Sequence, residues 1–339
     1  MSLPMDRIVG NGKLRHRLCD DILSEASSHA YIFSGPKGSG KHTLAMMYAA
    51  ALACENKGID GYALPCCECA SCKKILQKKS PDVFVVEKDG ASVKVEQIRE
   101  LQRSVKVAPN ELEHKVYIIE STETMTRQAQ NALLLTLEEP PPFVMFFLLC
   151  ESEEKLLETI KSRAPILRTE PIPPELVREH ILKVSEEARR LASSKPSELD
   201  AIISIADGCI GRALELTDEK TRQPFVYRRD VAEKLIDYAL SKSAVALTEL
   251  IISLPAKQDE LIPILTYAET ALRDLILLKK SEDAALCFYA DREAATEKAY
   301  SIGLNAMLGL YEKLGNTKDT LKRNANIKLT LTALLANIM

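Results

Sequence analysis

The sequence predicts an α/β domain followed by an all-α region. In the first half, short continuous apolar runs alternate with helical patterns, which indicates a parallel sheet covered by helices on both faces. After Thr221, apolar residues recur at i, i+3 and i+4, as in Leu261, Ile264 and Leu265, without strand-like alternation. This spacing indicates a helical bundle. The runs expected to form strands are Tyr31–Phe33, Val83–Val86, Val116–Ile119, Phe143–Leu149 and Ile166–Leu167.

Chain length and prolines divide the sequence into domains. A length of 339 residues exceeds the roughly 100–200 residues of one ordinary domain, so we expect two or three hydrophobic cores. Pro171, Pro173 and Pro174 restrict their own φ angles and the residues before them, so the alternating pattern ends there. We expect a parallel-sheet domain at residues 1–170, a small domain of short helices at 171–220 and a helical bundle at 221–339.

Composition excludes some classes of protein. A net charge of −3 and an isoelectric point near 6.1 provide no overall basic field, so any DNA contact is expected to be local or shared. The longest apolar run, Phe143–Cys150, is far shorter than the roughly 18 residues of a membrane-spanning helix. Asp6 and Arg7 precede no signal-type apolar segment, so we expect a cytoplasmic protein with no membrane contact.

A glycine-rich loop carries the strongest local signal. Gly35-Pro36-Lys37-Gly38-Ser39-Gly40-Lys41 lies between the expected strand at Tyr31–Phe33 and an expected helix at Thr43–Cys54. In this context backbone N–H groups and a helix N-terminus cradle phosphate, and the lysine reaches the β and γ phosphates. The sequence therefore predicts a P-loop, a nucleotide-binding-like element. Its candidate residues are Gly35, Gly38, Gly40, Lys41 and Thr43.

Two residues that ATP hydrolysis normally requires are missing. The Ser or Thr that holds Mg²⁺ after the loop lysine is replaced by His42, and successive helix residues are rotated by ~100°, so Thr43 is expected to point away from the metal position. The third expected strand ends in Glu120-Ser121, which leaves no second carboxylate to orient the attacking water. We therefore expect no intrinsic ATPase activity, and weak or absent binding of ATP or ADP.

The cysteines indicate a metal site. Nine cysteines are present, and their crowding between Cys66 and Cys72, in a chain without a secretory signal, indicates metal binding rather than disulfides. Cys66, Cys69 and Cys72 follow a C-x2-C-x2-C pattern, and with Cys54 they supply the four thiolates of a closed tetrahedral Zn²⁺ site. Cys67 stays open as a substitute ligand. The remaining cysteines, expected to be small core residues, are Cys19, Cys150, Cys209 and Cys287.

Six blocks of sequence together resemble one protein family. They are Ile8–Gly10, His29–Pro36, Gln128–Leu134, Leu137–Pro141, Ser162–Arg163 and Asn324–Leu329. The blocks are similar to bacterial DNA polymerase III clamp-loader subunits, the gamma/tau and delta-prime group of AAA+ proteins, and they extend over nearly the whole chain. The resemblance implies a P-loop AAA+ domain with an inserted zinc module at residues 54–72, a small helical lid domain and a C-terminal helical collar that joins subunits.

Within that group the chain resembles the delta-prime subunits. His42, Ser121 and Cys150-Glu151, where gamma/tau subunits have a Thr pair that senses the γ-phosphate, are similar to a degraded nucleotide site, and the length is similar to that of a subunit without a tau tail. The resemblance implies a non-hydrolysing subunit of a hetero-pentamer with gamma/tau and delta subunits. In that family the complex places the sliding clamp on primed DNA.

Two arginines match functional positions of the family. Ser162-Arg163 matches a motif whose guanidinium acts on the nucleotide of a neighbouring subunit, although Ala164 replaces the usual Cys. The resemblance therefore implies that Arg163, after a helix expected to begin near Glu153, is an arginine finger acting in trans. Arg212, in Gly211-Arg212, matches the family's lid arginine that faces nucleotide, and a surface arginine of the lid is the alternative.

Other interpretations stay open at this point. In a gamma/tau-like ATPase, Glu120 and Thr43 would be recruited to bind Mg²⁺, and Ser121 argues against this. A stand-alone AAA+ regulator would not need the helical bundle or the Asn324–Leu329 segment. The basic run Lys73–Lys79 is more typical of a solvated helix face than of a DNA-binding patch.

Overall fold

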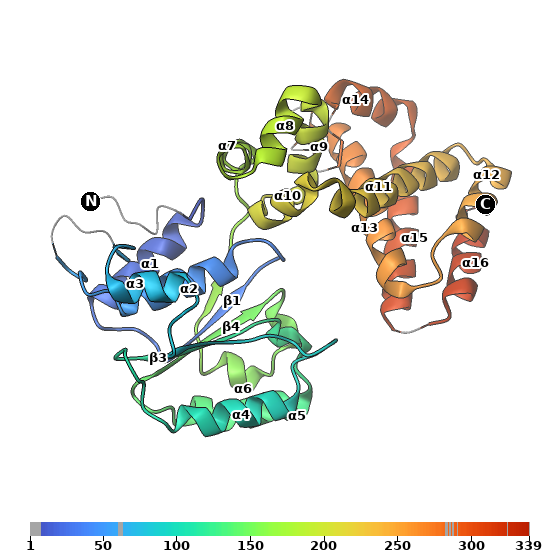
Figure 1. Ribbon diagram of the computed structural model, residues 1–339. Helices are drawn as coiled ribbons and strands as arrows, with labels where there is room; N and C mark the ends of the chain where they lie inside the picture. The colour runs from blue at the N-terminus through green and yellow to red at the C-terminus, as the bar shows by residue number, and fades with distance from the viewer. Residues whose placement is uncertain are drawn as a thin grey trace. The chain divides into compact units, whose positions relative to one another are not determined.

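The structure, a computed structural model, describes residues 8–59, 64–281, 284, 286, 288–289, 291–323 and 325–338 (Figure 1). Asp6, Arg7, Cys287 and Asn324 lie outside the described residues. The chain divides into two compact units: the first holds the residues up to His180 together with Gly208–Arg212, and the second holds Ile181–Asp207 and the residues from Ala213 onward. The domain boundaries expected near residues 170 and 220 stay a prediction.

A five-stranded parallel sheet forms the framework of the first unit. Its strand order is β2-β3-β4-β1-β5. In β1, Ile32 lies opposite Leu148 of β4 on one side and Ile166 of β5 on the other. All five predicted strands are confirmed: β1 spans Ala30–Ser34, β2 Val83–Val86, β3 Lys115–Ile119, β4 Val144–Cys150 and β5 Ile166–Arg168.

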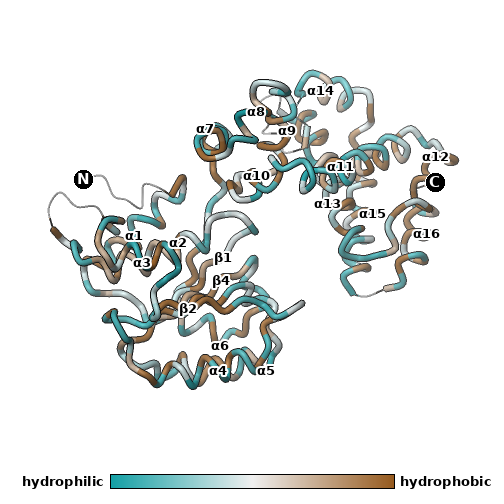
Figure 2. Tube along the Cα trace, in the orientation of Figure 1, coloured by the Kyte–Doolittle hydropathy of each residue, from teal (hydrophilic) through white to brown (hydrophobic). Residues whose placement is uncertain are grey.

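Both faces of the sheet are buried, and alternate residues of each strand face opposite sides. Tyr31, Phe33 and Phe147 pack in the core on one face, whereas Ile32 and Phe146 pack in the core on the other. Burial on both faces explains why the strands are continuous apolar runs, brown in Figure 2. Figure 1 shows α1 (Gly12–Leu23), α2 (Lys41–Leu52) and α3 (Ala70–Leu76) on one face, and α4 (Val95–Val105), α5 (Arg127–Glu138) and α6 (Glu158–Lys161) on the other.

Local signals set where the helices of this unit begin. α2 begins at Lys41 rather than at the expected Thr43, since Gly40 adopts a left-handed conformation with a φ of 89° and caps the helix. α5 begins after Thr126, whose hydroxyl oxygen accepts a hydrogen bond from the backbone N–H of Ala129. The helix expected to begin near Glu153 is instead a 3₁₀ turn, Glu153–Lys155, followed by the short α6.

The described residues of the second unit form helices and no strand. Leu261, Ile264 and Leu265 are fully buried on α13, which confirms the predicted helical spacing. α13 packs against α11, α14 and α15 around this core. No described helix is both long and apolar enough to cross a membrane. Two helices, α7 and α10, include residues of both units. The described helices from residue 174 onward are α7 (Pro174–Val184), α8 (Glu186–Ser194), α9 (Pro196–Ala206), α10 (Ile210–Thr217), α11 (Glu219–Leu240), α12 (Ala244–Ser253), α13 (Gln258–Leu278), α14 (Arg292–Ser301), α15 (Leu304–Lys322) and α16 (Ile327–Ile338).

A buried carboxylate holds the segment that leads into β3. Asp82 is fully buried, and its two oxygens accept hydrogen bonds from the backbone N–H groups of Asn110, Glu111 and Leu112 at 2.7, 2.7 and 3.0 Å. Burial raises the pKa of Asp82, but these donors more than offset that effect and hold the pKa below its ordinary value. The ionised carboxylate therefore ties the start of β2 to the chain before β3.

We predict that Asp82→Asn lowers the free energy of unfolding by about 1–3 kcal/mol, because an amide has one acceptor oxygen for these N–H groups instead of two. The stabilisation by the Asp82 carboxylate is fully present above the pKa of about 3.9 of an unfolded Asp, and it is lost as pH falls through the lower pKa of the folded state. Urea unfolding at several pH values measures this, with Asp89→Asn, at an exposed position, as the control. Equal unfolding free energies for the two variants at neutral pH would contradict the prediction.

Candidate nucleotide and metal sites

The glycine-rich loop leaves the carboxyl end of β1 and leads directly into α2. The Lys41 ammonium lies over this loop, where it donates hydrogen bonds to the carbonyl oxygens of Gly35 at 2.5 Å and Pro36 at 2.9 Å. Burial lowers the pKa of Lys41, and the negative charges of Glu151 and Glu123 oppose that shift. The predicted strand, loop and helix are therefore present, and the lysine charge is held by the carbonyls of the loop itself.

The start of α10 lies against this loop. The backbone N–H of Gly211 donates to the carbonyl oxygen of Gly38 at 2.9 Å. A Cβ atom on Gly38 would lie 2.5 Å from the Arg212 nitrogen, and one on Gly211 would lie 2.9 Å from the Gly38 Cα, so neither position holds a side chain without movement of the backbone. The Arg212 backbone is thus beside the loop, and contact of its guanidinium with nucleotide stays a prediction.

His42 and Glu120 contact each other directly. The Nδ1 of His42, in the first turn of α2, lies 2.6 Å from a carboxylate oxygen of Glu120, which follows β3. The hydrogen bond from His42 lowers the pKa of Glu120, against the effect of burial, and the charge of His42 adds to this. The two residues at the usual metal-binding positions are therefore partners of each other.

The donor set at these positions does not suit Mg²⁺. Mg²⁺ prefers oxygen ligands in near-octahedral geometry, whereas His42 presents a ring nitrogen and holds the Glu120 carboxylate. Thr43 is exposed on α2, and Ser121, in a left-handed backbone conformation with a φ of 50°, carries no carboxylate. His42 therefore supplies no substitute for the hydroxyl ligand that a Ser or Thr after the loop lysine would provide.

Glu123, a carboxylate near the loop, was not identified from the sequence. Glu123 lies in the 3₁₀ turn Thr122–Thr124, and its carboxylate accepts a hydrogen bond from the backbone N–H of Glu151 at 3.2 Å. Burial lowers the pKa of Lys41, and the charges of Glu151 and Glu123 oppose that shift. The only sequence signal for Glu123 was its position three residues after Glu120, whereas Glu151 stands where gamma/tau subunits have a Thr.

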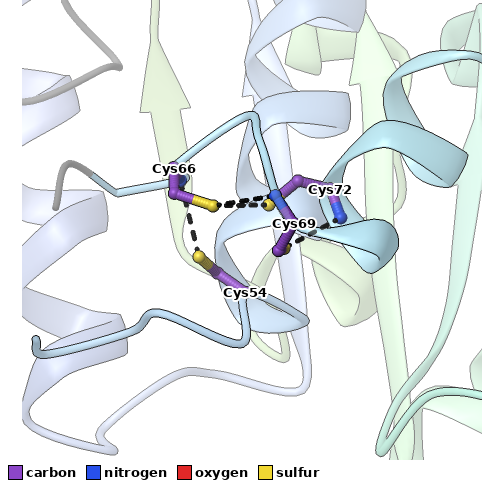
Figure 3. Close-up of side chains that lie close together, drawn as sticks. All are labelled: Cys54, Cys66, Cys69 and Cys72. Carbon is purple, nitrogen blue, oxygen red and sulfur yellow. Dashed lines mark hydrogen bonds between the residues drawn. The ribbon is translucent and has the colours of Figure 1, made fainter.

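The four cysteines predicted as metal ligands lie together (Figure 3). Their sulfur atoms all lie within 4.8 Å of one another, and those of Cys66 and Cys72 are 4.0 Å apart. A tetrahedral Zn²⁺ with Zn–S bonds of ~2.3 Å requires sulfur separations of ~3.8 Å, so small shifts would complete such a site. The group consists of Cys54, Cys66, Cys69 and Cys72.

Hydrogen bonds and burial act in opposite directions on these thiols. The backbone N–H groups of Glu68 and Cys69 donate to the Cys66 sulfur at 3.5 and 3.3 Å. Against the effect of burial, these donors lower the pKa of Cys66 to about 7, whereas burial raises the pKa of Cys54 and of Cys72. A cation bound among the sulfurs would offset the cost of burying them as thiolates.

Arg163 lies at the edge of the sheet opposite the glycine-rich loop. It precedes β5, and its guanidinium forms an ion pair with Glu138, at the end of α5, with a nitrogen-to-oxygen distance of 2.6 Å. It also donates to the Thr159 carbonyl oxygen at 2.9 Å. Because the strands are parallel, residues before β5 lie at the amino ends of the strands, whereas the loop follows the carboxyl end of β1. Glu138 was not identified from the sequence as the partner of Arg163.

An open pocket lies between α4 and α5. It has a volume of about 580 Å³ and contains none of the phosphate-loop residues. Arg99, Arg103 and Lys106 supply basic side chains to its lining. The basic run at Lys73–Lys79 contributes nothing to this pocket, and its Lys74 is exposed and pairs with a carboxylate on the surface at 2.8 Å.

The chain is similar to known DNA polymerase III subunits. A family model described as "DNA polymerase III, delta subunit" matches residues 10–173, which hold the sheet and the glycine-rich loop. DNA polymerase III subunit tau of Bacillus subtilis is 38% identical over 213 residues, which are 62% of this chain and 37% of that protein. DNA polymerase III subunit delta' of the same organism is 34% identical over 191 residues, which are 56% of this chain and 57% of that protein. The chain therefore spans less than two thirds of the length of either relative.

One solved structure aligns along almost the whole chain. A DNA polymerase III gamma subunit-related protein from Thermotoga maritima covers 96% of this chain and 98% of its own, with 17% identity and a TM-score of 0.44. The chain is a member of the AAA+ clamp-loader family of DNA polymerase III subunits.

Proposed function

We propose that this chain is a delta-prime-type clamp-loader subunit that does not hydrolyse ATP and supplies Arg163 to the nucleotide site of a neighbouring subunit. Its partners are gamma/tau and delta subunits in a hetero-pentamer, and the complex loads the sliding clamp onto primed DNA in the cytoplasm. The contact between His42 and Glu120 carries this proposal, because it occupies the groups that would hold Mg²⁺. The chain is similar both to a tau subunit and to a delta' subunit, so an ATPase is considered as the second candidate.

A gamma/tau-like ATPase is the second candidate, and Glu123 favours it. Burial lowers the pKa of Lys41, and the charge of Glu123 opposes that shift. A carboxylate beside the phosphates could orient an attacking water. Against this candidate, the Glu123 carboxylate accepts a hydrogen bond from Glu151, and the metal ligands of the site are missing. Steady-state hydrolysis separates the two candidates.

We predict that the purified chain releases phosphate from ATP and Mg²⁺ no faster than its Lys41→Ala variant. His42 replaces a metal ligand and Ser121 replaces the carboxylate that orients water. Hydrolysis of a bound ATP therefore lacks two of the groups that it requires. Hydrolysis that follows the protein through purification and disappears in Lys41→Ala would contradict the prediction. If Glu123→Gln also abolished that activity, the second candidate would be correct.

The position of Arg163 supports action on a neighbouring subunit. β1 is five residues long, so about 15 Å of strand separates the phosphate loop from the edge where Arg163 lies. An arginine side chain is shorter than this, so its guanidinium does not reach the loop of its own chain. A guanidinium presented to a second subunit can form two hydrogen bonds to phosphate oxygens and stabilise charge on a γ-phosphate bound there.

We predict that Arg163→Ala leaves assembly of the hetero-pentamer intact and slows ATP hydrolysis by the partner subunits in the presence of clamp and primed DNA. An arginine finger contributes ~10³ or more in rate at the site it serves, and this chain serves one of several sites, so the loss of total activity is partial. Single-turnover hydrolysis in the assembled complex measures the affected site as a separate slow phase. Wild-type rates in an assembled mutant complex would leave this chain a structural role only.

Glu138 allows a matched control for this experiment. Its ion pair with Arg163 is partly exposed and contributes only ~0–1 kcal/mol to stability. Glu138→Gln releases the guanidinium without removing it, so we expect a smaller loss of partner activity than in Arg163→Ala. Glu139→Gln changes the next, exposed residue, keeps the pair intact and is expected to retain the wild-type rate.

We further propose that the four clustered cysteines hold one structural Zn²⁺. The cluster packs in the same core as α2, so the metal would fasten the inserted segment to the helix that follows the phosphate loop. Four thiolates fill a tetrahedral ion, which leaves no open position for catalysis. Cys67, the substitute ligand considered from the sequence, is outside the cluster, and its thiol donates to the Pro65 carbonyl oxygen.

We predict that protein purified without chelator contains one Zn²⁺ per chain. Cys69→Ser removes a ligand and is expected to lose the metal and lower the melting temperature, whereas Cys67→Ser keeps the metal. Binding weakens as pH falls, because each thiol must lose its proton to bind. Elemental analysis and thermal unfolding measure these outcomes. Zinc-free wild-type protein, or loss of zinc in Cys67→Ser, would show that this ligand set is wrong.

Surface features support the proposed partners. Val245 and Ile252 on α12 are 73% and 78% exposed and lie seven residues apart, so they share one face of that helix. Exposed apolar side chains of this kind suit contact with another subunit. Arg99, Arg103 and Lys106 provide the local positive charge that contact with DNA phosphates requires in a chain of net charge −3.

A further inference from the structure

The phosphate loop satisfies its charged groups without a metal ion. The Lys41 ammonium is held by two loop carbonyls, and the Glu120 carboxylate is held by His42. In a Mg²⁺-dependent P-loop site, the metal links the phosphates to a hydroxyl after the lysine and to the acid after the third strand. Here the imidazole of His42, the residue after Lys41, contacts the carboxylate of Glu120, the acid after β3, directly.

We propose that this site binds a nucleoside diphosphate without Mg²⁺, with the His42–Glu120 pair in the place of the metal. The inference rests on the proposed function, in which the site is non-hydrolysing, and it names the ligand class and the metal requirement of that site. The loop, Lys41 and the N-terminus of α2 supply the phosphate donors, and the pair closes the position that Mg²⁺ would take.

The loop has room and an unused polar atom for this ligand. A Cβ atom on Gly40 would have no neighbour within 4 Å, so the space over the end of the loop is open. The Nε2 of His42 is buried and has no hydrogen-bond partner among the described residues. Buried polar atoms without partners are rare in folded proteins, and they call for a ligand or a water. A phosphate oxygen beside Nε2 would supply the missing partner while Nδ1 stays on Glu120.

The charges around the loop favour a diphosphate over a triphosphate. Mg²⁺ carries two positive charges, whereas the pair of His42 and an ionised Glu120 carries no net positive charge in either protonation state of the imidazole. The Gly35 backbone N–H donates to the Cys150 carbonyl oxygen at 3.1 Å, so Glu151 follows directly beside the loop, and the Glu123 carboxylate accepts from the Glu151 backbone N–H. A further phosphate near these two carboxylates would be repelled. A nucleoside diphosphate therefore suits this set of charges better than a nucleoside triphosphate.

Titration calorimetry of the full chain with ADP, in EDTA and in excess Mg²⁺, tests the proposal. We expect wild-type protein to bind ADP in EDTA and to bind no more tightly in Mg²⁺, because Mg²⁺ removes the metal-free ligand from solution. In His42→Thr the imidazole is absent and a hydroxyl follows Lys41, so Mg²⁺ is expected to tighten ADP binding at least ~10-fold, or about 1.4 kcal/mol. Lys41→Ala is expected to lose binding in both conditions, which assigns the heat to this loop.

The controls keep the outcome independent of the clamp-loader proposal. His16→Thr changes an exposed histidine of α1 and is expected to bind as the wild type does. Wild-type protein that binds ADP only with Mg²⁺, or in neither condition, would overturn the inference, and this comparison needs no variant to fold. Assembly of the hetero-pentamer and the effect of Arg163→Ala on partner hydrolysis are measured separately. Failure of those assays with metal-independent ADP binding would reject the proposed function alone.

Discussion

Parallel pairing in the central sheet is the constraint on which the first unit depends. β1 lies between β4 and β5, and β4 joins it to β3, so the segments that follow β1 and β3 leave the same edge of the sheet. Neighbouring strands lie ~4.8 Å apart, so the ends of β1 and β3 are separated by ~10 Å. His42, in the first turn of α2, and Glu120, at the end of β3, meet across this gap.

The contact of His42 with Glu120 bears on metal binding at the phosphate loop. A loop of this shape provides backbone donors whatever its side chains, so binding of phosphate and catalysis of its transfer are separable properties. Catalysis requires a metal and a positioned water, and the contact of His42 with Glu120 occupies the acid that would serve the metal. The loop therefore has the backbone geometry that suits phosphate, whereas His42 and Ser121 stand at positions where a hydroxyl ligand and a carboxylate would serve catalysis.

The groups that the proposed function uses lie at opposite edges of the sheet. The phosphate loop lies at the carboxyl edge, whereas Arg163 and Glu138 lie at the amino edge, before β5 and at the end of α5. Substitutions at the loop leave the contacts of Arg163 untouched, because a full strand length lies between them. In the proposed function, the loss of hydrolytic residues at one edge is therefore compatible with an arginine presented to a neighbour at the other. The cysteine cluster lies in a third place, in the core beside α2.

The sequence by itself determined the elements and the local motifs of this protein, and the tertiary structure decided which of their side chains meet. Continuous apolar runs predicted all five strands because both faces of the sheet are buried, and cysteine spacing predicted the four clustered thiols because three of them lie within one short segment. The contact of His42 with Glu120 joins residues 78 positions apart, and that of Arg163 with Glu138 joins residues 25 apart. Such contacts depend on strand order, which no periodicity in the chain encodes. Only the folded sheet therefore showed that the histidine after the loop lysine contacts the acid after β3.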